Sequence, residues 1–175
     1  MLLSIYKLCI SSTVFLFNYQ NKIIRFLLND LNHKTEWKLT KIVLPQHTDH
    51  AGVMWHGSYF SFLEEARIDA LNKVGKTYSE LSNKGYEIPV ISANIKYKMS
   101  FKHGEEILLT SQFKLLNKIR LKCKTLFLKV NGDIGAEAIM ELVVVRNKFH
   151  SIKLIRELPI EIKSILLLLE EGPKN

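Results

Sequence analysis

One long apolar helix, followed by segments in which apolar and polar residues alternate, constrains the fold of this chain more than any other feature. From Tyr59 to Val74, apolar side chains recur at helical spacing, and Gly75 follows where such a helix would end. The sequence therefore predicts a helix over about residues 58–74. Its apolar arc is broader than a surface helix needs, so we expect a sheet to wrap around it.

The period of the pattern changes to two from Ile91 onward. Every second residue from Ile91 to Phe101 is apolar, and the residues between them are polar, which predicts a half-buried antiparallel strand. Turn residues then separate further strands, and Asn131 with Gly132 is a strong signal for a type I′ hairpin. The three further predicted strands cover residues 107–116, 119–127 and 134–145.

Shorter elements complete the predicted fold. A first strand is expected over 36–44, ending at Pro45, and a short helix with a turn over 78–85. A terminal helix over 158–171 is expected to pack either on the domain or on a partner subunit. This order of elements indicates an α+β fold, in which an antiparallel five-stranded sheet is wrapped round a central long helix, with a C-terminal helix added.

Composition places the chain among ordinary globular domains and narrows its partners. Its 175 residues, with 47% hydrophobic and 24% charged residues, suit one domain with a sizeable core. The net charge of +8 suits an anionic membrane or a polyanionic small molecule. Nucleic acid is the weakest candidate partner, because the sequence has no aromatic–basic cluster. Cys9 and Cys123 are too few for a disulfide framework, which favours a reducing compartment, the cytoplasm.

Residues 1–34 differ from the rest and are interpreted as an N-terminal extension to a single domain over 35–175. Asp30 is the only acidic residue among them, and no run reaches the roughly 18 apolar residues of a membrane helix. Three interpretations compete: an organelle transit peptide, a weak membrane-surface helix, or a translated upstream segment that the domain does not need. We favour the last, and we expect no integral membrane span.

Residues 45–59 carry most of the functional information. They contain three histidines, one carboxylate and two glycines, and they lead directly into the predicted helix. Ser58 or Ser61 can cap that helix, with Ser61 and Glu64 as a capping box. Backbone N–H groups at a helix N-terminus can hold a developing oxyanion, while the carboxylate of Asp49 attacks or deprotonates a water molecule.

The same residues carry a resemblance to a known family. Residues 49–59 match the pattern D-x-x-G-V-x-W-H-x-x-Y, and residues 64–67 of the helix match E-x-A-R. The pattern resembles the hotdog-fold acyl-CoA thioesterases of the 4-hydroxybenzoyl-CoA thioesterase type. The resemblance implies hydrolysis of an acyl- or aroyl-CoA thioester to free acid and CoA, with no metal or redox cofactor. It also implies a homodimer or homotetramer, in which the sheets of two subunits run on into each other.

The resemblance assigns roles to individual residues. It makes Asp49 the catalytic carboxylate, either as nucleophile or as general base for water, and it places the oxyanion at the backbone N–H of His56. Gly57 beside it lets another backbone approach closely. These few catalytic groups suffice for a thioester, because its leaving thiol, with a pKa near ~8.5, departs readily as a thiolate. The alternatives are that Asp49 only orders the loop as an Asx turn and that His56 only caps the helix.

Substrate binding is expected at the helix start and on one strand. Three aromatic residues are expected to line the acyl pocket: Trp55, Tyr59 and Phe60. Tyr59 equally suits the core. Cations on the polar face and turn of the strand that begins at Ile91 suit the phosphates of CoA, although a solvated strand face is the alternative. These cations are Lys96, Lys98, Lys102 and His103.

Two helix carboxylates offer a fallback. Arg67 falls in the apolar arc, where a lone charge is unfavourable, and Glu64 three residues earlier is its expected ion-pair partner. Another branch of the hotdog thioesterases uses a helix glutamate as the catalytic carboxylate. Glu64 or Glu65 would therefore take the catalytic role if Asp49 did not.

Other functions compete with hydrolysis of acyl-CoA. His47 and His50 are suitable metal ligands together with Asp49 and His56, but their spacing matches no zinc pattern, so no metal site is predicted. One rival function is a thioesterase for acyl carrier protein, which would dock an acidic partner on the basic surface. The other is a non-catalytic hotdog protein that binds acyl-CoA.

Overall fold

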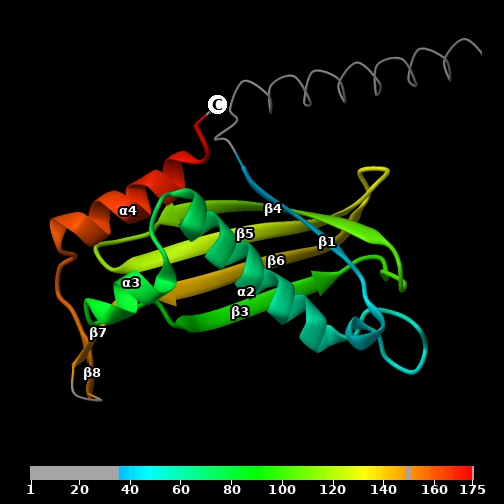
Figure 1. Cartoon of the computed structure of the whole chain (residues 1–175), viewed down its shortest axis with the longest axis horizontal. Coiled ribbons are helices and arrows are strands. Elements are labelled where there is room, and N and C mark those ends of the chain that lie inside the picture. Colours follow the sequence, from blue (N-terminus) through cyan, green and yellow to red (C-terminus); the bar gives the residue numbers. More distant parts are fainter. Residues whose placement is uncertain (1–35, 149–150, 175) are drawn as a thin grey trace, which may run out of the picture. The chain divides into compact units, whose positions relative to one another are not determined.

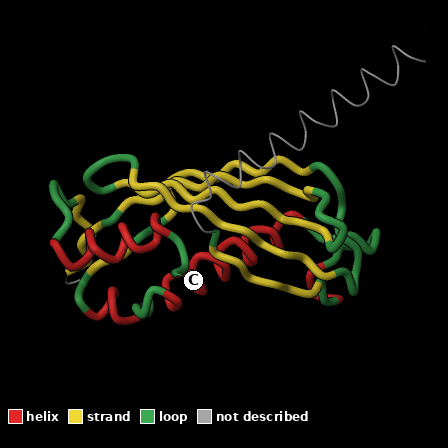
Figure 2. Tube along the Cα trace, turned by 90° about the horizontal axis from the view of Figure 1, so that it is seen from above, coloured by secondary structure: helices red, strands yellow, loops and turns green. Residues whose placement is uncertain are grey.

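The computed structural model describes residues 36–148 and 151–174, so the expectations for residues 1–34 lie outside the described residues. A five-stranded antiparallel sheet forms the body of the domain, in the order β1-β4-β5-β6-β3. The helix α2 (His56–Lys73) runs along one face of this sheet (Figures 1 and 2). The strands are β1 (Trp37–Ile42), β3 (Val90–Tyr97), β4 (Glu106–Leu115), β5 (Arg120–Lys129) and β6 (Ile134–Val143).

The core lies between α2 and the sheet, as the broad apolar arc of the helix predicts. Alternate residues of each strand point toward the helix. Phe113 lies opposite Cys123 across β4 and β5, Cys123 lies opposite Met140 across β5 and β6, and all three are buried. The predicted α+β architecture, with an antiparallel five-stranded sheet around one long helix, is confirmed. The apolar side chains that α2 buries are Tyr59, Phe62, Leu63, Ala66, Ala70 and Leu71.

The N-terminus of α2 differs from the prediction. The helix begins at His56, two residues early, and its N-cap residue Trp55 makes no side-chain capping bond. The hydroxyl of Ser58 donates to a loop carbonyl, and that of Ser61 donates to the carbonyl four residues before it. The capping box expected from Ser61 and Glu64 is therefore wrong, because both residues lie inside the helix.

Glycines end two elements where a positive φ is required. Gly75 has a φ of 82° and follows Val74, the C-cap residue of α2, as predicted. Gly132 has a φ of 85°, and its N–H bonds the carbonyl of Lys129 at 2.8 Å. The N–H of Lys129 in turn bonds Asp133 at 2.9 Å, so three residues form the loop. The predicted hairpin is present, but its loop is longer than the two residues of a type I′ turn.

A second sheet of three strands, in the order β2-β7-β8, was not predicted. The interpretation of residues 134–145 as the last strand is wrong, because β6 ends at Val143 and the N–H of Val144 bonds the carbonyl of Ile119. Residues 142–145 are all buried, so one continuous apolar run conceals the change of sheet. The strands are β2 (Tyr86–Glu87), β7 (Val145–Lys148) and β8 (Ser151–Leu154).

Two shorter helices agree with the prediction. α3 (Tyr78–Asn83) lies where the short helix was expected, and α4 (Ile160–Glu171) forms the terminal helix. The indole N–H of Trp37 donates to the carbonyl of Leu169 at 2.8 Å, so α4 packs on its own domain. Within the described ranges, no helix has both the length and the apolar character needed to cross a membrane. The buried residues of α4 are Ile162, Ile165, Leu166 and Leu169.

The apolar row of β3 remains uncovered in the single chain. In the described part of the chain, β3 is an edge strand that pairs only with β6, and α2 lies closer to β1 and β4. Ile91 is 47% exposed and Tyr97 is 52% exposed, and Met99 just beyond the strand is 38% exposed. The strand is present as predicted, but it ends at Tyr97 and not at Phe101, and the expected half-burial is not reached within one chain.

The packing of α4 is testable by truncating one buried side chain. Leu166→Ala should lower the free energy of unfolding by about 2–5 kcal/mol, because it leaves a cavity at a fully buried position. Ile160→Ala is the matched control, since Ile160 is 89% exposed, and it should change stability by less than about 0.5 kcal/mol. Denaturant unfolding monitored by tryptophan fluorescence measures both. Equally small effects would contradict the docking of α4.

Candidate active site

The loop before α2 folds back on itself as a narrow hairpin held by main-chain hydrogen bonds. It starts at the 3₁₀ turn η1 (Pro45–His47). The carbonyl of His47 accepts from the N–H of Trp55 at 3.0 Å, and the N–H of Asp49 donates to the carbonyl of Val53 at 2.9 Å. These bonds place Asp49 near the tip of the hairpin, while its returning arm continues into α2.

The hairpin is also attached to the chain that follows β3. The N–H of Met54 donates to the carbonyl of Phe101 at 2.7 Å, and Val53 forms a β-bridge with Lys102. Phe101 is fully buried, so this attachment point belongs to the core. The loop that carries Asp49 and the exit of β3 therefore lie at the same end of the domain.

Asp49 has one oxygen engaged and one free. Its Oδ1 accepts from the N–H of Ala51 at 2.8 Å and from that of Val53 at 3.4 Å, which is the Asx-turn arrangement named as the alternative role. The residue is exposed, and within the described residues its Oδ2 has no hydrogen-bond partner. The turn fixes the direction of the carboxylate and leaves Oδ2 accessible.

The first turn of α2 presents backbone donors. The N–H groups of His56 and Gly57 precede the first intrahelical hydrogen bonds and so have no acceptor within the helix. Gly57 is required there for a reason that differs from our expectation. A Cβ at this position would lie 2.1 Å from the indole ring of Trp55, so a side chain, and not another backbone, approaches the glycine.

A cavity of about 290 Å³ opens between the first turns of α2 and the exit of β3. Its lining residues are Met54, His56, Tyr59, Tyr97, Lys98, Met99 and Ser100. Three of the predicted site residues are among them: His56, Tyr59 and Lys98. The predicted residues that do not line it are Asp49, Trp55, Gly57, Phe60, Lys96, Lys102 and His103.

Part of the cavity wall was not predicted. Tyr97 and Met99 were expected on the buried face of a strand, because apolar alternation does not indicate what covers an apolar row. The position of β3 at the sheet edge leaves that row open, and the cavity forms beside it. No sequence pattern indicated Met54 as a cavity residue, apart from its place in the motif.

Tyr59 belongs both to the core and to the cavity. It is 3% exposed, and its ring packs against Tyr97 with the centroids 4.9 Å apart and against Phe127 at 5.2 Å. Burial raises the pKa of Tyr59 to about 12, with smaller contributions from Tyr97 and Glu105. Its phenol therefore stays neutral at physiological pH and can offer an O–H donor at the cavity wall.

Lys98 carries positive charge to the same cavity. Its ammonium lies 3.5 Å from Glu137, which also pairs with Lys124 at 3.1 Å. Hydrogen bonding and charge from Lys124, with a smaller effect of Lys98, hold the pKa of Glu137 below its ordinary value. Three other predicted cations are exposed and make no direct ion pair in the described part of the chain: Lys96, Lys102 and His103.

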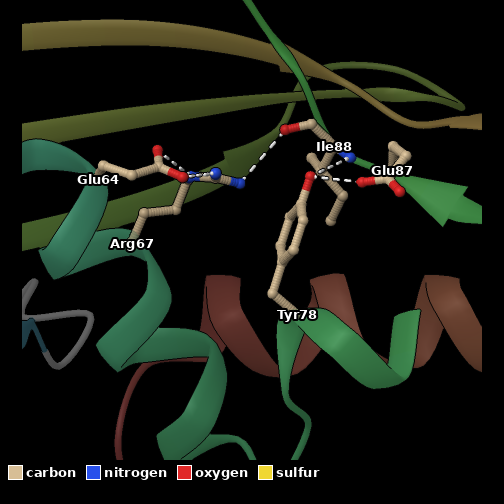
Figure 3. Close-up of polar contacts among 5 residues, drawn as sticks. All are labelled: Glu64, Arg67, Tyr78, Glu87 and Ile88. Carbon is tan, nitrogen blue, oxygen red and sulfur yellow. Dashed lines mark hydrogen bonds and ion pairs between the residues drawn. The ribbon is translucent and has the colours of Figure 1, made fainter. Parts of the chain in front are cut away.

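The ion pair predicted between Arg67 and Glu64 is confirmed. Arg67 is 8% exposed, and both carboxylate oxygens of Glu64 accept from its guanidinium, one of them from Nε at 3.1 Å (Figure 3). Nη1 donates to the carbonyl of Ile88 at 3.2 Å, just before β3. The hydroxyl of Tyr78 accepts from the N–H of Ile88 and donates to Glu87 at 2.8 Å. This network connects α2 and α3 to the approach to β3.

The structure also shows where Glu65, His47 and His50 lie. Glu65 pairs with Lys41 of β1 at 2.6 Å, away from the cavity lining. His47 and His50 lie on the hairpin. Among the residues that the structure describes, no three His, Cys, Asp or Glu side chains converge into a group that could hold a metal ion.

Two curated proteins are similar to part of this chain. A protein of Synechocystis sp. named as an esterase is 35% identical over 80 residues, which are 46% of this chain and 48% of that protein. A Bacillus subtilis protein named as an acyl-CoA thioesterase is 34% identical over 58 residues, 33% of this chain and 42% of that protein. The chain thus spans less than half the length of these curated relatives.

A solved structure and a family model cover more of the chain. The 1,4-dihydroxy-2-naphthoyl-CoA thioesterase from Synechocystis superposes with a TM-score of 0.68 at 17% identity, covering 77% of this chain and 98% of that one. At this identity the likeness concerns the fold. Residues 43–164 match the family model described as the Thioesterase-like superfamily, which is well over half of the chain. The chain therefore belongs to the thioesterase-like superfamily, and its fold is the hotdog fold.

Proposed function

We propose that this protein hydrolyses the thioester of an acyl- or aroyl-CoA, releasing the free acid and CoA. The main support is the cavity of about 290 Å³ at the first turn of α2, where the N–H groups of His56 and Gly57 have no intrahelical acceptor. Membership of the thioesterase-like superfamily agrees with this function. So do the names of the Bacillus subtilis relative and of the Synechocystis structure.

The proposed reaction needs few groups. The Oδ2 atom of Asp49 removes a proton from water as the water adds to the thioester carbonyl, or Oδ2 itself adds to form an acyl anhydride that water then hydrolyses. The N–H groups at the start of α2, where the helix dipole is positive, hold the oxyanion. Breakage of the C–S bond releases CoA as a thiolate, which needs little acid assistance because its thiol pKa is near ~8.5.

The cavity walls indicate the kind of acyl group. Two tyrosine rings and two thioethers form most of the lining, and such side chains suit an aromatic ring or a short aliphatic chain. Lys98 at the rim supplies a point charge for a phosphate of CoA. We therefore propose small aromatic or short acyl-CoA thioesters as substrates.

The role of Asp49 is testable by an isosteric change. Asp49→Asn should lower kcat by at least ~10²-fold while the protein stays folded, because the amide is neither a base nor a nucleophile. Asp69→Asn is the control, since Asp69 makes a surface ion pair with Lys73 on α2. Release of free thiol from a panel of acyl-CoA, aroyl-CoA and acyl-carrier-protein thioesters measures the rate, and a chelator should leave it unchanged.

Each departure from these results has a meaning. Near-normal kcat in Asp49→Asn would remove Asp49 from the mechanism. Hydrolysis of acyl-carrier-protein thioesters alone would favour the rival substrate, and binding of acyl-CoA without hydrolysis would favour a non-catalytic protein. Loss of activity with the chelator, restored by zinc, would indicate a metal site.

Glu64 is expected to act through structure alone, because its carboxylate is engaged by Arg67. Glu64→Gln should lower the free energy of unfolding by about 1–3 kcal/mol, since it leaves the guanidinium of a buried arginine without its counter-charge. It should leave kcat within about 3-fold of the wild type, a change of less than about 1 kcal/mol in the barrier. Thermal denaturation and initial rates on the same preparation measure both. A loss of kcat as large as that of Asp49→Asn would restore Glu64 as the catalytic carboxylate.

We also propose that the protein is at least a dimer joined along β3. Within residues 36–148 and 151–174, the outer edge of β3 has no partner strand, and its apolar row is exposed in the single chain. A second copy, related by a two-fold axis, would pair with this edge and stand over Tyr97 and Met99. Two equivalent cavities would then lie at the subunit boundary.

The dimer is testable at one edge residue. Ile91→Glu should shift the protein toward monomer and lower its specific activity, because a charge would be buried between the two edges. Ile160→Glu, at an 89% exposed position on α4, should do neither. Light scattering and activity on dilution measure the two effects. A wild-type monomer with full specific activity would contradict a shared site.

The proposed location is the cytoplasm. Cys123 is a free, buried thiol, and burial raises its pKa to about 11. A protonated, inaccessible thiol is compatible with a reducing compartment.

A further inference from the structure

His47 connects three elements around the loop that carries Asp49. Its Nδ1 accepts from the N–H of Leu44, just after β1, at 3.1 Å. Its carbonyl accepts from the N–H of Trp55 at 3.0 Å and from the hydroxyl of Ser58 at 3.1 Å. Its ring packs edge-on against Phe62, with the centroids 4.8 Å apart and the planes at 82°.

These contacts fix both ends of the loop. Ser58 and Phe62 lie one turn apart on α2, and both are buried, so His47 contacts the same face of the helix at two successive turns. The main-chain hydrogen bond between His47 and Trp55 closes the hairpin that has Asp49 near its tip. The carboxylate therefore cannot shift relative to the start of α2 unless His47 also moves.

The side chain of His47 supplies two separate properties. Its Nδ1 provides a hydrogen-bond acceptor for the N–H of Leu44. The acceptor occupies the place of the acidic or amide side chain in a capping box of the η1 turn. The ring adds the aromatic contact with Phe62, which an acidic or amide side chain could not make.

We propose that His47 is a positioning residue, which holds the Asp49 carboxylate in register with the N–H groups at the start of α2 and does not touch the substrate. The inference rests on the proposed thioesterase function. His47 is not among the residues that line the cavity, so its replacement should change kcat and leave KM nearly unchanged.

Two substitutions separate the acceptor from the ring. His47→Phe keeps an aromatic ring beside Phe62 but removes the acceptor for Leu44, whereas His47→Asn keeps an acceptor at the same distance from the backbone and removes the ring. Since a misplacement of about 1 Å in a reacting group can lower a rate ~10²-fold, His47→Phe should lower kcat by ~10- to 100-fold. His47→Asn should retain kcat within about 3-fold of the wild type, because the acceptor sets the loop position.

His50→Phe is the matched control. His50 lies on the same hairpin and is exposed, and its side chain makes no hydrogen bond, ion pair or ring contact with the described residues. The control should leave kcat unchanged. Amide hydrogen exchange gives a readout that does not depend on activity: exchange at Trp55 and Val53 should become faster in His47→Phe and stay slow in His47→Asn and His50→Phe.

The outcomes distinguish this inference from the proposed function. If the wild type hydrolyses no thioester, the proposed function fails, and the exchange pattern alone decides whether His47 holds the loop. Unchanged kcat in His47→Phe, or unchanged exchange at Trp55, would overturn the inference. So would an equal loss of kcat in His47→Asn, or a matching loss in His50→Phe. A loss of kcat in His47→Phe without a change in amide exchange would show that His47 supports catalysis without holding the loop, which also contradicts the inference.

Discussion

The fit between α2 and the sheet is the constraint on which the rest of the structure depends. Phe62 and Leu63 are almost completely buried in this contact, and each such side chain stabilises the fold by roughly 1.5–3 kcal/mol. The helix cannot rotate about its axis without exposing them. The orientation of its first turn is therefore fixed, and so are the directions in which the N–H groups of His56 and Gly57 point. The position of the proposed oxyanion site thus follows from core packing many residues further along the helix.

Arg67 is the one charged residue on that buried face, and its partners explain how it is tolerated. Desolvation of a guanidinium is unfavourable unless its donors are satisfied, and here Glu64 and the carbonyl of Ile88 accept from it. The second of these contacts lies just before β3. The hydroxyl of Tyr78 bonds the N–H of the same residue, so helix and strand start are held together. The strand that bounds the cavity therefore begins at a fixed point relative to α2.

The features that the sequence predicts are those that depend on local pattern. The helix over 58–74 and the alternating strand from Ile91 follow from their periods, and the motif around Asp49 identified the loop at the start of the helix. The break at Val144 was missed because the apolar run continues through it. The N-terminus of α2 was misplaced because the hydroxyl of Ser58 donates to a loop carbonyl instead of accepting from a backbone N–H as a cap. Half of the cavity wall was not predicted, because the burial of a strand face depends on which part of the molecule packs against it.

The cavity and the free sheet edge coincide, and this has a physical consequence. One wall is the first turns of α2, and the other is the exit of β3, an edge strand. An added strand would satisfy the unpaired N–H and C=O groups of that edge and would enclose the cavity in the same step. Enclosure excludes water, which strengthens the hydrogen bonds that hold an oxyanion. In the proposed dimer, association through β3 and completion of the proposed catalytic environment would be one event, so catalytic strength would depend on the same contacts that hold the assembly together.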